Sequence, residues 1–158
     1  MKRSLFVLGA LAVTFSVVAA QNLDVIKKRQ AIMDTLGSNA IAQFRMAKGD
    51  TPFDLAKVQA SFATFQTEAA KLKTLFPEDS KTGGDTDASA KIWADKPAFD
   101  AVIDKFIAVN KEASDASKDE ASFKLAFPKA SESCNNCHKE SDGFSPRLRD
   151  SFKKMKPS

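Results

Sequence analysis

The chain of 158 residues is poor in several residue types that carry chemistry or mark a fold. It has no tyrosine, one tryptophan, one histidine and two cysteines. A structural zinc site is normally completed by cysteine and histidine ligands, and this chain has too few of them to build one. A sustained alternation of polar and apolar residues is also missing, which disfavours a β-sheet fold.

The chain also lacks a strong excess of charge of either sign. Its formal net charge is +4, and Lys2 and Arg3 near the N-terminus account for part of it. Without these two residues the charge is +2, which is too small to indicate a nucleic-acid partner. Charged residues of both signs are interspersed through the rest of the chain, as on an ordinary water-exposed surface.

Long hydrophobic runs are confined to the first twenty residues, MKRSLFVLGALAVTFSVVAA. Lys2 and Arg3 precede an uncharged run that ends in Ala19 and Ala20, which is typical of a Sec-type signal peptide over residues 1–20. A retained membrane anchor is the alternative, because the run almost reaches the roughly 20 residues that span a bilayer. We expect cleavage after about Ala20, export to the periplasm and no stable membrane insertion afterwards. Residues 21–158 then form one domain with a basic C-terminal tail from about residue 143.

Four stretches of this domain have the hydrophobic periodicity of α-helices. The first covers about residues 24–47, the third begins near Asp95, and the fourth begins near Asp119 and runs on to His138. The second, with Thr51 or Asp54 as its cap, is the most regular, because its apolar residues recur at steps of three and four: Leu55, Val58, Phe62, Phe65, Ala69 and Leu72. The pattern predicts an all-α fold, an antiparallel four-helix bundle.

Prolines and glycines predict where these helices end or bend. Pro77 is expected to end the second helix, and Pro97 fits the first turn of the third. Pro128 lies inside the fourth helical pattern and is expected to kink it. Residues 77–97 are predicted to form one long polar connection with a glycine pair as its turn.

Both cysteines and the only histidine lie together in the segment CNNCH, residues 134–138. This spacing is the attachment signature of c-type haem. Cys134 and Cys137 are close enough along the chain for each thiol to add to one haem vinyl group, and the adjacent His138 then lies beneath the iron as its ligand. We therefore predict one haem c, bound covalently through Cys134 and Cys137. A large flat apolar group would also help to fill a core that is rich in alanine.

Other uses of these residues remain open on the residues alone. A disulfide between Cys134 and Cys137 is possible in an exported protein, and a redox-active dithiol uses the same spacing, although such dithiols usually lie in βαβ surroundings. The second axial position of the iron is open between Met33, Met46 and an empty site. Met33 lies on the apolar stripe of the first helix, where a methionine is usually core filler.

The sequence resembles the cytochrome c′ family, the class II cytochromes c, over nearly the whole of residues 21–158. The resemblance rests on DVIKKRQAIM (24–33), AKGDTPFD (47–54), LFPEDSKTGGDTDASAKIWADKPAFD (75–100) and CNNCH (134–138). The loop segment, with GGD followed by KIW, is its most specific part. The resemblance implies a four-helix bundle with the covalently attached haem in its core, the architecture known for cytochrome c′.

The resemblance also implies roles for two residues of the first helix. In the family, the residue four positions after an arginine of this helix faces the open side of the haem. Leucine there leaves the iron five-coordinate, whereas methionine ligates it and makes it low-spin. Arg29 is followed at that distance by Met33, so His138 and Met33 are the implied metal ligands. Arg29 could reach a haem propionate, with a surface charge as the alternative, and Trp93 could cover a haem edge or simply pack the loop.

One segment departs from the family pattern. Family members usually carry an aromatic residue and an arginine three and four positions after the haem histidine, where this chain has Ser141 and Asp142. Arg147 or Arg149 could fill the missing role. The tail also holds a small basic cluster, which could steer an acidic redox partner or form a solvated terminus: Lys153, Lys154 and Lys156.

Together these features predict an exported monohaem cytochrome that carries single electrons between a redox donor and an acceptor, as a monomer or a homodimer. Met/His ligation suits this role because the low-spin iron changes charge with little rearrangement. No catalytic residues are expected, since the only imidazole would be bound to iron. The alternatives are a five-coordinate protein that binds nitric oxide or carbon monoxide, and a haem-free helical redox or interaction module.

Overall fold

The computed structural model describes residues 22–138 and 143–144. The predicted signal peptide (1–20), Ser141, Asp142 and the basic residues of the tail lie outside the described residues. Within the described part of the chain, no helix is both long enough and apolar enough to span a bilayer.

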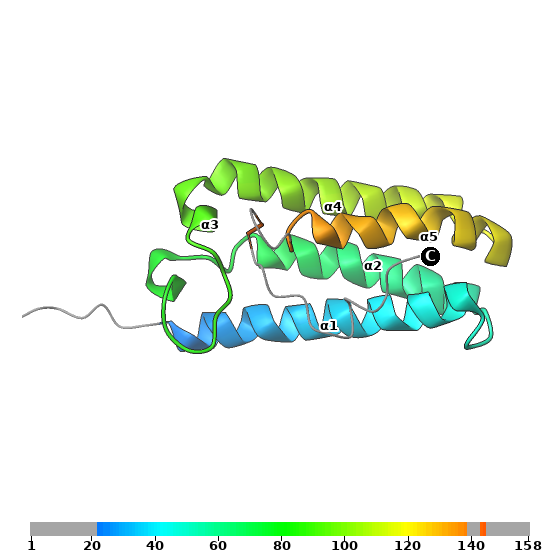
Figure 1. Cartoon of the computed structure of the whole chain (residues 1–158), viewed down its shortest axis with the longest axis horizontal. Coiled ribbons are helices and arrows are strands. Elements are labelled where there is room, and N and C mark those ends of the chain that lie inside the picture. The colour runs from blue at the N-terminus through cyan, green and yellow to red at the C-terminus, as the bar shows by residue number, and fades with distance from the viewer. Residues whose placement is uncertain (1–21, 139–142, 145–158) are drawn as a thin grey trace, which may run out of the picture.

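Four long helices form an antiparallel bundle, which confirms the predicted fold class (Figure 1). Each packs against two of the others, with α1 and α4 both touching α2 and α5. Their bounds are α1 Leu23–Lys48, α2 Leu55–Leu72, α4 Lys96–Ala116 and α5 Glu120–Asn135. The described residues contain no strand.

Side-chain caps begin all four helices. The side chain at each N-cap accepts a hydrogen bond from a backbone N–H three residues later, which satisfies one of the unpaired amides of the first turn. The caps are Asn22 (3.2 Å), Asp54 (3.1 Å), Asp95 (3.0 Å) and Asp119 (2.8 Å). Of the two predicted caps of α2, the structure therefore selects Asp54. Pro97 lies in the first turn of α4, as predicted.

One proline prediction, the end of the second helix at Pro77, is wrong, and the kink at Pro128 stays a prediction. The second helix ends at Leu72, well before Pro77, because the amides of Thr74 and Leu75 bond three residues back and tighten its last turn. Pro77 instead caps a short 3₁₀ helix, η1 Glu78–Ser80. Pro128 lies within α5, and the helix continues through it to Asn135.

The long loop, residues 73–95, has more structure than the sequence predicted. It contains η1 and a one-turn helix, α3 Lys91–Ala94. Gly83 and Gly84 supply the predicted turn, with φ of 98° and 56° that other residues rarely adopt. The loop lies at the end of the bundle where α1 begins and α2 ends (Figure 1).

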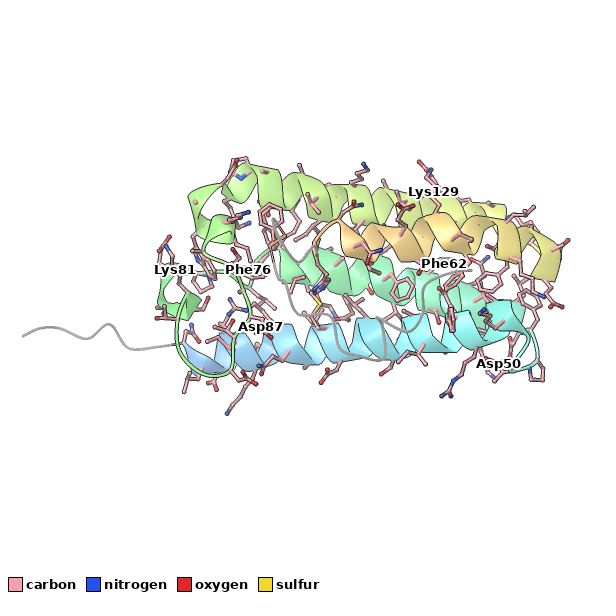
Figure 2. All side chains as sticks on the ribbon, in the orientation of Figure 1. Asp50, Phe62, Phe76, Lys81, Asp87 and Lys129 are labelled. Atoms are coloured by element: carbon pink, nitrogen blue, oxygen red, sulfur yellow. The ribbon has the colours of Figure 1, made fainter. Side chains whose placement is uncertain are left out.

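The core has two parts. One part includes Met46, Phe62 and Phe123, and the other lies beside the long loop and includes Phe99 and Ile103. Figure 2 shows Phe62 inside the bundle, well away from Phe76 on the loop side. Leu36 and Phe106 contact both parts.

We expect Phe62→Ala to lower the free energy of unfolding by about 3–5 kcal/mol, because its side chain has no exposed surface and its loss leaves a cavity. Denaturant unfolding of the purified protein measures this change. Leu125→Ala is the control, since Leu125 is 84% exposed and its loss should change stability by less than about 0.5 kcal/mol. Equal effects of the two substitutions would contradict the burial of Phe62 in the core.

Candidate functional site

A cavity of about 420 Å³ opens in the loop-side half of the bundle. This volume is in the range of cofactor and ligand sites. Its walls come from α1, α2, α4, the long loop and the segment that follows α5, and most of the side chains are apolar. The residues that line it include Arg29, Met33, Phe99, Cys137, His138 and Phe144.

The cysteine–histidine motif lies where α5 ends. The helix stops at Asn135, so Cys134 is in its last turn and Cys137 and His138 follow it, whereas the sequence pattern extended the helix to His138. The carbonyl oxygen of Cys134 accepts hydrogen bonds from the amides of Cys137 (3.2 Å) and His138 (3.3 Å). This tight turn brings Cys137 and His138 into the cavity wall.

Both cysteines are free thiols in an apolar environment. Burial, with a smaller contribution from the neighbouring Cys137, raises the pKa of Cys134 to about 12, and burial raises the pKa of Cys137 to about 11. Redox-active dithiols depend on a lowered thiol pKa, so these surroundings do not suit a thioredoxin-like pair.

The structure places only one of the two candidate methionines at the cavity. Met33, on α1, lines the same cavity as His138 and is partly exposed to it. Met46 is 4% exposed and belongs to the other part of the core, with Phe62 and Phe123. A methionine and the only histidine therefore reach one cavity from two different elements.

Arg29 is buried and anchors the long loop to α1. Its Nη1 atom donates to the carbonyl oxygen of Leu75 (3.1 Å) and to Ser80 Oγ (2.9 Å), and its Nη2 atom donates to the carbonyl oxygen of Ser80 (2.9 Å) and to Thr86 Oγ1 (3.2 Å). The guanidinium also lies 4.7 Å from the ring centre of Phe76. Burial lowers its pKa from the ordinary value. Arg29 lines the cavity, but these contacts engage both Nη atoms with the loop, and its contact with a propionate stays a prediction.

Trp93 packs the loop. Its Nε1 donates to the carbonyl oxygen of Pro77 (3.2 Å), and its ring meets that of Phe76 edge to face at 5.7 Å. The described residues that line the cavity include Phe76 but not Trp93. Of the two roles considered for Trp93, the geometry favours packing.

Phe76 and Phe144 line the cavity, although no pattern in the sequence predicted it. Phe76 follows the end of α2 and lies on the loop side of the bundle (Figure 2), and Phe144 follows the cysteine–histidine motif. Neither belongs to a helical repeat of apolar residues, and such repeats were the only guide to buried positions.

The residues present fit a haem. The cavity lies between helices, its lining is largely apolar, and a cysteine and a histidine project from one wall with a methionine on another. Cysteine thiols, imidazole and thioether are the groups that attach c-type haem and ligate its iron.

Comparison with known proteins points the same way. A family model described as Cytochrome C′ matches residues 24–140. The chain is 41% identical over 138 residues to cytochrome c′ of Rhodopseudomonas palustris, covering 87% of this chain and 94% of that protein. A solved structure of cytochrome c′ from the same organism is 43% identical, with a TM-score of 0.71 over 74% of this chain and 94% of the other.

Two further relatives differ in name or in bound ligand. Cytochrome c-556 of R. palustris is 36% identical over 142 residues, covering 87% of this chain and 95% of that protein. The nitric oxide complex of a variant of cytochrome c prime from Alcaligenes xylosoxidans is 26% identical, with a TM-score of 0.65 over 75% of this chain and 94% of the other.

We expect Arg29→Ala to destabilise the holoprotein by about 3 kcal/mol or more, because several buried acceptors lose a charged donor. Cleavage of the long loop by a protease should also become faster, since Arg29 ties it to α1. Lys28→Ala, at an exposed position of the same helix, is the control. An Arg29→Ala protein with the stability and cleavage rate of this control would show that the loop is held by other contacts.

Proposed function

Because the chain belongs to the cytochrome c′ family, we propose that it is a one-electron carrier whose iron is held between His138 and Met33. It is a monohaem c-type cytochrome, and like its relatives it carries covalently attached haem c. The observation that carries the proposal is that Met33 and His138 line one cavity, whereas Met46 lies in the other part of the core.

We assign the covalent attachment to Cys134 and Cys137. The carbonyl oxygen of Cys134 closes a turn that holds the backbone of Cys137 and His138 close to Cys134. One short segment would thus supply both attachment points and one iron ligand.

Met33 would supply the second iron ligand. It lies one helical turn after Arg29, whose side chain is held by four hydrogen bonds, so the backbone of this part of α1 is well fixed. When bound, the haem supplies an iron that alternates between Fe(II) and Fe(III) and so takes up or gives up one electron. With His138 and Met33 both bound to the iron, small molecules would be excluded and the change of charge would need little rearrangement.

Export to the periplasm after cleavage near Ala20 is part of the proposal, as are a redox protein as donor and another as acceptor. We assign no catalytic residue. Binding of nitric oxide or carbon monoxide is the second candidate function, supported by the nitric oxide complex of the A. xylosoxidans relative. It requires that Met33 leave the iron or never ligate it.

Met33→Leu tests the ligand assignment. We expect it to change a six-coordinate low-spin spectrum to a high-spin one and to permit binding of carbon monoxide, because leucine fills the space but offers no sulfur. Optical spectra of the oxidised and reduced proteins measure both effects.

Met46→Leu is the matched control, since it removes the same sulfur from the other part of the core and should leave the spectrum unchanged. A high-spin spectrum of the unsubstituted protein would favour gas binding over electron transfer. A low-spin spectrum that survives Met33→Leu and is lost in Met46→Leu would reverse the assignment.

Substitution of the cysteines tests the attachment. We expect either Cys134→Ala or Cys137→Ala to leave one thioether bond, and the double substitution to leave none. Haem staining after denaturing electrophoresis and the mass of the intact protein report this directly. Covalent haem in the double variant would contradict the assignment.

A further inference from the structure

Phe144 lies outside the part of the chain that matches the family model, which ends at residue 140, yet it lines the cavity. Its ring meets that of Phe99 edge to face, with centres 5.2 Å apart. Its carbonyl oxygen accepts a hydrogen bond of 2.8 Å from the amide of Ser89 in the long loop. The preceding residue, Gly143, is buried.

These two contacts join three elements that are far apart in the sequence. Phe99 is in the first turn of α4, Ser89 is in the long loop, and Phe144 follows the cysteine–histidine motif. Asp87, Ala88 and Ile92, which are close to Ser89 in the sequence, line the same cavity as Phe144. The phenylalanine ring therefore lies where the loop and α4 meet.

We propose that Phe144 closes the wall of the cavity between the long loop and α4 and controls how fast water and small molecules reach the haem site. The proposal rests on the haem occupying this cavity, and it holds whether or not Met33 is a ligand. A molecule that passes this part of the wall must separate the ring of Phe144 from that of Phe99. Phe144 is a positioning residue: it would control the passage of small molecules to the haem site and would not contact the iron.

The size of the effect follows from the contact. Loss of one aromatic pair changes the balance between a closed and an open wall by roughly 2- to 10-fold. Phe144→Ala should therefore speed the binding of carbon monoxide to the reduced holoprotein by about this factor. Phe144→Leu keeps part of the apolar contact, so its rate of carbon monoxide binding should lie between those of Phe144→Ala and the protein that keeps Phe144.

The experiment uses Met33→Leu as its background, so that release of the methionine does not limit the rate. Carbon monoxide association is followed by flash photolysis in this background with and without Phe144→Ala. If the unsubstituted protein is already high-spin, the same comparison is made without Met33→Leu. The optical spectrum thus tests whether Met33 ligates the iron. The ratio of the association rates with and without Phe144→Ala tests the role of Phe144.

Phe53→Ala is the matched control, because Phe53 forms a similar ring pair with Phe123 (5.8 Å) in the other part of the core. It should weaken the fold without changing the association rate. A second readout is amide hydrogen exchange at Ser89, which should become faster in Phe144→Ala and stay unchanged in Phe53→Ala.

Faster carbon monoxide binding and faster exchange at Ser89, in Phe144→Ala alone, is the expected result. An unchanged association rate in Phe144→Ala would overturn the proposal, because access would then follow another route. Equal acceleration by Phe53→Ala would also overturn it, since general loosening of the bundle would explain both.

Discussion

The guanidinium of Arg29 joins the first helix to the long loop, and the loop-side half of the molecule is organised around this contact. A buried charge is costly unless its donors are paired, and here the acceptors come from Leu75, Ser80 and Thr86. None of these residues is near Arg29 in the sequence. The loop is therefore folded onto α1 by the need to satisfy one cation, and Phe76 is stacked against that cation as a result.

The chemistry of the site follows from where helices begin and end. The last turn of α5 carries Cys134, and the tight turn after it carries Cys137 and His138. The first helix presents Met33 to the same cavity from another wall. Two elements that are far apart in the sequence thus bring an imidazole and a thioether to one cavity, while α2 and α4 contribute apolar walls.

Much of the fold could be predicted from the sequence because the helices are regular and their caps are strong. The starts at Asp54, Asp95 and Asp119 follow from local chemistry, and so does the haem motif. The end of α2 was placed too late because proline is a possible stop and not an obligatory one. The order in the long loop could not be predicted, since it depends on hydrogen bonds between residues about fifty positions apart.

Only the part of the site that leaves a pattern in the sequence could be predicted. A resemblance to known proteins pointed to Met33, and the structure adds that Met46 is enclosed elsewhere. The anchoring contacts of Arg29 and the position of Phe144 are long-range and leave no local pattern. They depend on how segments that are distant in the sequence meet in the folded protein.

The division of the core has an evolutionary consequence. One half, built around Phe62 and Phe123, contributes no buried residue to the cavity, and among the apolar side chains of the described residues Leu36 and Phe106 pack against both halves. Residues of the cavity half can therefore be exchanged while the other half preserves the four-helix architecture. Substitutions that reshape the surroundings of the cofactor would then cost little of the stability of the fold, so a lineage could acquire a new cavity lining with no need to invent a new protein.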